Sequence, residues 1–321
     1  MSNLADTLRT DMEMFLNQFA GEKVLFVPNE GNVGDCLIFA ATLDVFSKAS
    51  IGVEVVDKGA DFRNRTVFLG GGGNLVGLYR GMRETIEACR DQAARIILLP
   101  HTIRGNVDLI QAFDSRATIW CRDLRSFEYV GMLNPSLDRR LAHDMAFHCD
   151  ATHLLNDPRC SAFGPPMLQA GLDRHRTNLD RISHLPVVRF MRTDREARST
   201  RIRTDLDVSR AFGRVADAES SKLAAWCFLK TISAAKRVVT DRLHVAIACA
   251  LLHKECELVD NSYNKNREIY AHSLRRFEWI SFSKSAGETI ADLPSPKRSL
   301  LARAARHTQR FCDRFLSAEV Q

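Results

Sequence analysis

An arginine and a histidine stand two positions apart where an apolar segment of the chain ends. In the stretch VVTDRLHV, residues 238–245, Arg242 and His244 come after one apolar run and before another. A guanidinium binds phosphate or carboxylate through a planar fork of donors, and an imidazole can give or take a proton near neutral pH. The pair therefore predicts an anion site with an acid–base residue beside it. The structural alternative is a buried histidine bonded to a backbone carbonyl.

A second arginine follows an apolar run in the first half of the chain. Arg122 and Asp123 come directly after ATIWC, residues 117–121. If both runs are strands of parallel sheets, their carboxyl ends line a ligand cleft, and Arg122 and Arg242 would hold one anion from two sides. The alternative for Arg122 is an ion pair with Asp123 that ties the loop to the next helix.

Two glycine-containing motifs also follow predicted strands. PNEGNVGDCLIF, residues 28–39, opens a helix whose first N–H groups can face an anion or a sugar hydroxyl; a simple helix cap is the alternative. FLGGGGNLVGLY, residues 68–79, places four glycines at a strand end, which indicates backbone packed against a ligand or the other domain rather than a flexible turn. The first motif is not GxGxxG, so a dinucleotide site is not supported. The residues predicted to line the cleft are Asn32, Gly34, Asp35, Gly72, Gly73 and Asn74.

Further polar residues follow or interrupt apolar runs. His101 lies in HTIRG, and His143 and Asp144 lie in AHDMAF. His101 and Asp144 are predicted to line the cleft, and His143 is a further candidate. For each, the alternative is a satisfied structural polar group, which we favour over a catalyst. A polar loop after the apolar run ECELV, residues 255–259, can hold a phosphate or a sugar, or can instead cap the next helix. The residues of this loop predicted to line the cleft are Asn261, Ser262, Tyr263 and Lys265.

The composition is that of a globular chain with a basic surplus. The 321 residues are 45% hydrophobic and 26% charged, with a net charge of +6 and many more arginines than lysines. This balance suits an anionic ligand, a membrane surface or a nucleic acid. Because no basic tract is interleaved with aromatic residues, we expect a phosphorylated small molecule and no nucleic acid. Nine scattered cysteines without a CxxC pair indicate neither a disulfide framework nor a zinc site.

Short apolar segments alternate with helical patterns along most of the chain. This alternation predicts an α/β fold with two Rossmann-like, doubly wound domains that face a cleft. Strands are expected at residues 23–28, 52–56, 66–70, 95–100, 117–121, 185–191, 237–240 and 255–260. The expected domains are an N-terminal one over residues 1–155 and a C-terminal one over residues 186–293, with an interdomain region rich in turn formers over 156–185 and a basic helix over 294–321.

Taken together, the motifs resemble those of the polysaccharide pyruvyl transferase family. They occur in one order within residues 24–270: GNVGD, LGGGGN, IILLPHTI, CRDLRS, HDMAF, RFMRTDRE, VVTDRLHVAIACALLHK and VDNSYNKN. The resemblance implies a GT-B arrangement of the two domains. It also implies an enzyme that transfers a pyruvyl group from phosphoenolpyruvate, as a ketal, to a sugar of a surface polysaccharide or of its lipid-linked precursor.

The resemblance also assigns roles to particular residues. The RLH motif marks the donor site, so Arg242 would bind phosphoenolpyruvate and His244 would be the catalytic acid that protonates its methylene carbon. Arg122 matches the family's RD motif, and Arg192, in RFMRTDRE, is a further donor-binding candidate. No cofactor or metal is implied, because arginines can carry the charge that Mg²⁺ carries elsewhere. His101 is a departure, since relatives often carry glutamine there.

Two other functions stay open at this point. A GT-B glycosyltransferase that uses a nucleotide sugar would share the fold and a basic cleft. A non-catalytic assembly or lectin-like protein would keep the fold alone, although the presence of Arg122, Arg242 and His244 together argues against it.

The location of the protein is inferred from its apolar segments. None is long enough for a spanning helix, and the N-terminus lacks the apolar core of a signal peptide, so we expect a cytoplasmic protein. The basic amphipathic tail, residues 294–316, has two interpretations. It is either a peripheral contact with the inner face of the plasma membrane, near a lipid-linked acceptor, or a helix packed on the first domain, which we favour.

Overall fold

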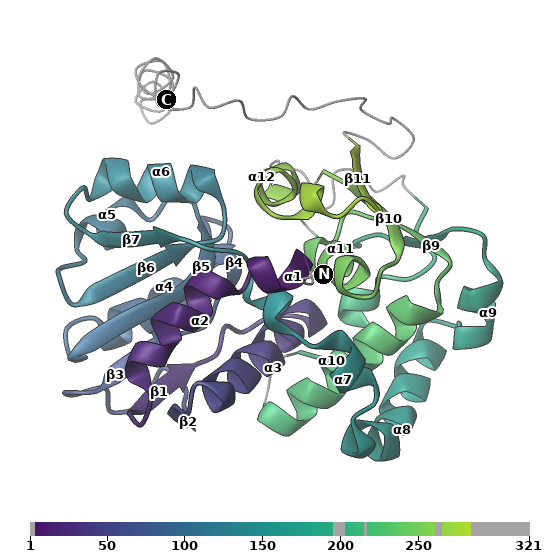
Figure 1. Ribbon diagram of the computed structural model, residues 1–321, viewed down its shortest axis with the longest axis horizontal. Helices are drawn as coiled ribbons and strands as arrows, with labels where there is room; N and C mark the ends of the chain where they lie inside the picture. The colour runs from purple at the N-terminus through teal and green to yellow at the C-terminus, as the bar shows by residue number, and fades with distance from the viewer. Residues whose placement is uncertain (1–3, 195–202, 215–216, 261–264, 284–321) are drawn as a thin grey trace. The chain divides into compact units, whose positions relative to one another are not determined.

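Two parallel sheets form the framework of the computed structural model (Figure 1), which describes residues 4–194, 203–214, 217–260 and 265–283. The strands of the first sheet are β1 (Lys23–Val27), β2 (Gly52–Val55), β3 (Thr66–Leu69), β4 (Gly72–Leu75), β5 (Arg95–Ile103), β6 (Ala117–Cys121) and β7 (Asp138–Leu141). Those of the second are β8 (Val188–Phe190), β9 (Arg237–Thr240), β10 (Glu255–Val259) and β11 (Ile280–Ser283). The spatial orders are β2-β1-β3-β5-β6-β7, with β4 beside β5, and β11-β10-β9-β8. Every pairing within these two sheets is parallel, which confirms the α/β interpretation.

Helices connect the strands of both sheets. In chain order they are α1 (Leu4–Thr7), α2 (Thr10–Leu16), α3 (Val33–Lys48), α4 (Gly81–Cys89), α5 (Val107–Gln111), α6 (Leu124–Leu133), α7 (Ala151–Leu155), α8 (Pro158–Arg174), α9 (Leu179–His184), α10 (Ala218–Ala234), α11 (Leu243–Leu251) and α12 (Lys265–His272). All the predicted strands are present, with β5 longer and β8 shorter than expected. Three strands were not predicted, namely β4, β7 and β11. The sequence of β7, DRRL, is polar because this strand lies at an edge and pairs with β6 alone among the described strands.

The segment predicted as an interdomain region is largely helical. Its turn-forming residues begin α8, where Asp157 caps the helix by accepting a hydrogen bond from the Cys160 N–H at 2.8 Å. The helix continues through a proline pair because it packs on α10. A Cβ on Gly164 would lie 2.5 Å from the ring of Trp226, so glycine permits this close contact. Tertiary packing here outweighs the low helix propensity of glycine and proline.

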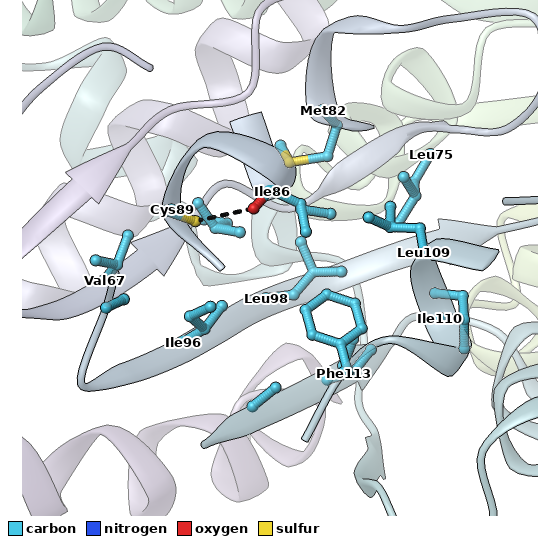
Figure 2. Packing of buried hydrophobic residues seen from close by; sticks show 14 of the residues in the cluster. Val67, Leu75, Met82, Ile86, Cys89, Ile96, Leu98, Leu109, Ile110 and Phe113 are labelled. Atoms are coloured by element: carbon cyan, nitrogen blue, oxygen red, sulfur yellow. Dashed lines mark hydrogen bonds between the residues drawn. The ribbon is translucent and has the colours of Figure 1, made fainter. Parts of the chain in front are cut away.

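The two faces of the first sheet bury different side chains. Along β3, Val67 and Leu69 belong to an aliphatic cluster formed with α4 and α5, part of which Figure 2 shows. Phe68, between them, lies on the opposite face, where its ring is 5.0 Å from that of Phe19 and 5.1 Å from that of Phe46. Successive strand residues point to opposite faces, so the near-continuous apolar strands reflect a sheet covered on both sides.

The run of four glycines interrupts a strand. The first half of β5 pairs with β3 and its second half with β4, and the break between β3 and β4 is made by Gly70 and Gly71. A Cβ on Gly70 would lie 2.3 Å from the backbone N of Asn29, and one on Gly71 would lie 2.8 Å from the carbonyl O of Pro100. The glycines therefore permit close packing of backbone on backbone. They also place β4 beside the second half of β5, near the carboxyl ends of the strands.

Helices α3 and α10 pack against one another and so join the elements of the two sheets. Both sheets lie in one compact unit, Met1–Glu288, so the division at residues 155 and 186 stays a prediction, as does the GT-B arrangement. In the part of the chain that the structure describes, no helix has the length and apolarity needed to cross a membrane.

Asp241, in the stretch VVTDRLHV, connects the segments that follow β8, β9 and β10 through hydrogen bonds. It follows β9, is 3% exposed, and accepts a hydrogen bond from the Arg192 N–H at 2.8 Å. Its carbonyl accepts another from Nδ2 of Asn266, also at 2.8 Å. Burial raises the pKa of Asp241 to about 6, although the bond from Arg192 and the charges of Arg192 and Arg242 oppose the rise.

We expect Asp241→Asn to stabilise the protein at neutral pH. Below the unfolded-state pKa the carboxyl is protonated in both states. As the pH rises from there to about 6, the unfolded chain releases this proton while the folded protein keeps it, so stability falls across this window and levels off above it. This rise in the pKa of Asp241 corresponds to about 3 kcal/mol of stability at most. Asparagine keeps an oxygen that can accept from Arg192. Urea unfolding across the range from about pH 4 to about pH 8 measures the effect.

The exposed Asp180, whose side chain is 83% accessible, provides a control as Asp180→Asn. That variant should follow the wild-type pH dependence. If the free energies of unfolding of wild type and Asp241→Asn change with pH in the same way in the acid range, the pKa of Asp241 is not raised in the folded protein.

Candidate active site

A cavity of about 830 Å³ is lined by segments that follow strands of both sheets. Residues after β1 and β6, together with residues in and after β4, form one part of its wall, and residues after β8, β9 and β10 form another. In open α/β sheets, ligands bind at the carboxyl ends of the strands, so this is the expected place for a site.

The structure brings most of the predicted site residues to this wall. Those that line it are Asn32, Asp35, Gly73, Asn74, Arg122, Arg192, Arg242, His244 and Lys265. His101 and Asp144 are fully buried and do not line the cavity, and Gly34 and Gly72 instead pack closely on neighbouring side chains. Asn261, Ser262 and Tyr263 lie outside the described residues.

A buried carboxylate links the arginine of the first sheet to the histidine of the second. Asp144 is 0% exposed, and its Oδ2 accepts a hydrogen bond from Nη1 of Arg122. The same oxygen lies 3.6 Å from Nε2 of His244, just beyond hydrogen-bond distance. Burial acts to raise the pKa of Asp144, but the charge of Arg122 and the contact with His244 outweigh it and hold this pKa well below its ordinary value. Asp144 therefore stays an anion that holds Arg122 and faces His244.

Arg242 is held by two carboxylates. Its Nε and Nη2 donate to the two oxygens of Asp207 at 3.0 and 2.6 Å, and its Nη1 lies 2.8 Å from Oδ2 of Asp194. Arg242 is 4% and Asp207 3% exposed, so this is a nearly buried bidentate pair. Arg192 joins the same network through Asp194, at 2.9 Å. The arginines predicted to bind an anion thus reach the cavity with carboxylate partners already in place.

The start of α3 forms the helix cap that the sequence left open as an alternative. Oδ1 of Asn32 accepts from the Gly34 N–H at 2.9 Å, and Oδ2 of Asp35 accepts from the Asn32 N–H at 3.0 Å. Both capping residues also line the cavity. Burial raises the pKa of Asp35, against the opposing charges of His244 and Arg122. A Cβ on Gly34 would lie 2.3 Å from Nδ1 of His244, so glycine lets the helix start approach that ring.

Asp123 has a structural position beside the site. It caps α6 by accepting from the Ser126 N–H at 2.8 Å, and it pairs with Arg104 at 2.9 Å. Thr102 donates to its second oxygen at 2.9 Å and in turn accepts from Nε of Arg122, also at 2.9 Å. Arg122 pairs with Asp144 rather than with Asp123, so the ion pair between neighbours that the sequence suggested is not formed.

Two other histidines are less suited to acid chemistry. His101 is 0% exposed, and its Nε2 accepts from the Leu75 N–H at 3.2 Å. Burial, with the charge of Arg122, lowers the pKa of His101 to about 3. His143 stacks on His272 with ring centroids 4.4 Å apart, and burial together with the charge of His272 lowers its pKa to about 3. Both rings are neutral near pH 7, and neither lines the cavity.

Several charged residues of the wall were missed by sequence reasoning. They are Glu30, Asp194, Arg210 and Arg214, together with Asp207 behind Arg242. All except Glu30 lie in the charged loop over residues 192–217, which has no periodic pattern. The density of charge in that loop was the one available signal, but it does not indicate which side chains turn inward.

The balance of charge in the wall favours an anionic ligand. Six cationic side chains face three carboxylates among the described lining residues: Arg122, Arg192, Arg210, Arg214, Arg242 and Lys265, against Glu30, Asp35 and Asp194. A concave surface with a positive surplus attracts and concentrates anions. A histidine in the same wall adds a group that can exchange a proton with such a ligand.

Comparison with known protein families identifies the ordered motifs. A family model described as polysaccharide pyruvyl transferase matches residues 32–263, a range that includes Arg122, Arg242 and His244. The chain belongs to the polysaccharide pyruvyl transferase family. This confirms the resemblance inferred from the motifs. Lys265, in the cavity wall, lies just beyond the matched range.

Relatives of known structure support the fold of this pyruvyl transferase family member. A crystal structure of an uncharacterized protein from Klebsiella pneumoniae subsp. pneumoniae NTUH-K2044 is similar, with a TM-score of 0.69 and 26% sequence identity. The similarity covers 89% of this chain and 100% of that chain. Among curated proteins, no significant match was found.

We expect Asp144→Asn to destabilise the protein strongly. The substitution leaves the guanidinium of Arg122, which is 1% exposed, without its compensating charge. Removing one partner of a buried ion pair costs about 3–5 kcal/mol. Urea unfolding measures the change in the free energy of unfolding.

The double variant Arg122→Met/Asp144→Asn is the matched control, because it removes the uncompensated charge as well. We expect it to be more stable than Asp144→Asn alone. If the free energy of unfolding of Asp144→Asn falls by less than about 1 kcal/mol, the pair of Arg122 and Asp144 does not stabilise the fold as a buried ion pair.

Proposed function

We propose that this protein transfers the pyruvyl group of phosphoenolpyruvate to a saccharide, forms a cyclic ketal and releases inorganic phosphate. Family membership supports pyruvyl transfer with a polysaccharide as the acceptor. The observation that carries the choice of donor is the cationic cavity with His244 in its wall. Phosphoenolpyruvate brings a phosphate and a carboxylate, which guanidinium groups bind well, and a methylene carbon that must be protonated.

His244 has the part of general acid in this proposal. Its proton passes to the methylene carbon, and the adjacent carbon becomes electron-deficient. The oxygen of a sugar hydroxyl bonds to that carbon, and its proton returns to the imidazole of His244. The bond from carbon to the phosphate oxygen then breaks, and phosphate leaves with the electron pair. A second hydroxyl of the same sugar bonds to the carbon and closes the ketal, and its proton passes to the departing phosphate. The arginines stabilise the charge on the departing phosphate, so the proposal includes no metal and no cofactor.

The nearby carboxylates fit these roles. Asp144 holds Arg122 and lies 3.6 Å from the Nε2 of His244, so it fixes the positions of an anion ligand and of the acid together. Asp207 does the same for Arg242 by a bidentate bond. Groups held in place before the substrate arrives do not lose freedom during the reaction, and this lowers the barrier.

The setting of the reaction is also part of the proposal. We infer a cytoplasmic enzyme whose acceptor is a lipid-linked polysaccharide precursor. The basic tail lies outside the described residues, so its membrane contact or its packing on the first domain stays a prediction. The family match does not favour the nucleotide-sugar glycosyltransferase. A thermal-shift comparison of phosphoenolpyruvate with nucleotide sugars tests that alternative.

We expect Arg242→Ala to weaken binding of phosphoenolpyruvate by roughly ten- to a hundredfold, since a charged hydrogen bond to a buried anion contributes about 1.5–3 kcal/mol. Arg242→Lys should recover part of the affinity, because it restores the charge but not the fork. Calorimetry measures the dissociation constants. Asp207 loses its partner in the alanine variant, so unfolding by urea must be measured alongside.

Arg237→Ala is the control, because this arginine is at the start of β9 and its side chain is 51% exposed. It should bind phosphoenolpyruvate as the wild type does. A folded Arg242→Ala protein with wild-type affinity would remove Arg242 from the donor site.

We expect His244→Gln to lose most turnover and still bind phosphoenolpyruvate. Losing a general acid costs typically about 10²–10⁴ in rate. Single-turnover release of phosphate, measured beside calorimetric binding on the same variant, separates the two effects. His184→Gln, at a position where the side chain is 76% exposed, is the control and should retain full activity.

Each alternative result has a definite meaning. Wild-type turnover in His244→Gln would place the acid elsewhere, and Asp35 in the same wall would be the next residue to test. Loss of binding and turnover together, with the fold intact, would make His244 an anion ligand and not the acid.

A further inference from the structure

A second cavity of about 800 Å³ adjoins the cationic one. Glu30 and Asn74 belong to the walls of both cavities. The second cavity lies over the ends of β1 and β2 and beside the start of α4, so it is formed largely by elements of the first sheet. Its wall includes residues 27–30 and 55–60 and part of α4.

The charge of this second wall is opposite to that of the first. Its described lining includes four carboxylates, Glu30, Asp57, Glu84 and Asp217, and one cation, Lys58. Lys58 is paired with Glu84, with 2.5 Å between Nζ and Oε2. A negative surplus disfavours phosphate and carboxylate ligands. Carboxylate oxygens accept hydrogen bonds from hydroxyl groups, so the wall suits an uncharged ligand that carries many hydroxyls.

A buried amide in this wall lacks a partner. Asn29 is 5% exposed, and its Oδ1 accepts a hydrogen bond from Nδ2 of Asn74 at 2.6 Å. Its Nδ2 has no hydrogen-bond partner among the described residues. An unpaired buried donor costs about 1–3 kcal/mol and is rare without a reason. A Cβ on Gly72 would lie 2.4 Å from this Nδ2, so glycine leaves room for the amide there.

We propose that the second cavity binds the acceptor saccharide, as an uncharged sugar unit whose hydroxyls pair with Asn29, Glu30 and Asp57. This inference rests on the proposed pyruvyl transfer. Nδ2 of Asn29 donates to a hydroxyl oxygen, and the carboxylates accept from hydroxyl groups. Because Glu30 and Asn74 line both cavities, a sugar bound here presents its hydroxyls to the donor carbon in the adjoining one. The negative wall also disfavours a uronic acid at this position.

Two exposed glycines provide a matched pair of blocking variants. A Cβ on either Gly77 or Gly81 meets no atom within 4 Å, and neither residue has a positive φ. Gly81 lines the second cavity, whereas Gly77 lines neither of the two cavities. Gly81→Trp therefore obstructs the proposed sugar site, and Gly77→Trp adds the same bulk nearby without doing so. Asn29→Asp is a second probe, which replaces the unpaired donor with an acceptor.

The assay measures phosphate release from phosphoenolpyruvate as a lipid-linked saccharide extract, from cells that make the protein, is added in increasing amounts. For Gly81→Trp and Asn29→Asp we expect the half-saturating amount of extract to rise about tenfold or more, a loss of roughly 1.4 kcal/mol in binding. The KM for phosphoenolpyruvate should stay unchanged in both variants. Gly77→Trp should match the wild type in both measurements.

The outcomes separate this inference from the function on which it rests. If wild type releases phosphate in response to the extract and neither variant needs more extract, the sugar does not bind in the second cavity. The same conclusion follows if Gly81→Trp raises the KM for phosphoenolpyruvate as much as it raises the requirement for extract. If wild type binds phosphoenolpyruvate but shows no response to the extract, the proposed function itself is wrong.

Discussion

The arrangement of the site depends on one buried anion, Asp144. A carboxylate with no exposure to water is costly unless a cation and hydrogen bonds compensate it, and Arg122 supplies both. The same oxygen faces His244, which is carried by α11 on the second sheet. The two motifs that contain Arg122 and His244 are therefore positioned by a single group, which belongs to neither motif. Any relative movement of the two sheets would separate the charges around Asp144, and this favours one fixed geometry of the cavity wall.

Glycines permit the close approach that this arrangement needs. A Cβ on Gly73 would lie 2.2 Å from Nη2 of Arg122, and one on Gly34 would lie 2.3 Å from Nδ1 of His244. Each glycine therefore leaves the space in which the side chain of Arg122 or His244 lies. The motifs LGGGGN and GNVGD contain glycine for packing against protein groups, in addition to any contact with a ligand. Their place at strand ends follows, because that is where Arg122 and His244 must be accommodated.

The sequence predicts those parts of the site that follow directly from local pattern. Arg122, Arg242 and His244 come after short apolar runs, and parallel strands bring such positions to one edge, so their convergence could be inferred. The partners of Arg242 could not, because Asp194 and Asp207 lie in a loop whose course depends on tertiary contacts such as the bond from the Asp205 N–H to the Arg189 carbonyl. Helix α8 was missed for a similar reason, since its packing on Trp226 is not visible in local propensity.

Under the proposed function, the opposite charges of the two cavities would let adjoining walls bind two unlike substrates. In the first cavity, Asp144, Asp194 and Asp207 pair with arginines, so the positive surplus is moderate. The surplus still raises affinity for an anion. When the anion is absent, these carboxylates compensate the buried cations. Carboxylates in the second cavity would disfavour that anion at the place proposed for the sugar. Asn74 lies at the boundary, since it donates a hydrogen bond to Asn29 and also lines the cationic cavity. The difference in charge between the two cavities would thus place a sugar hydroxyl beside the reacting carbon of the donor. No movement of the protein would be needed to bring the two substrates together.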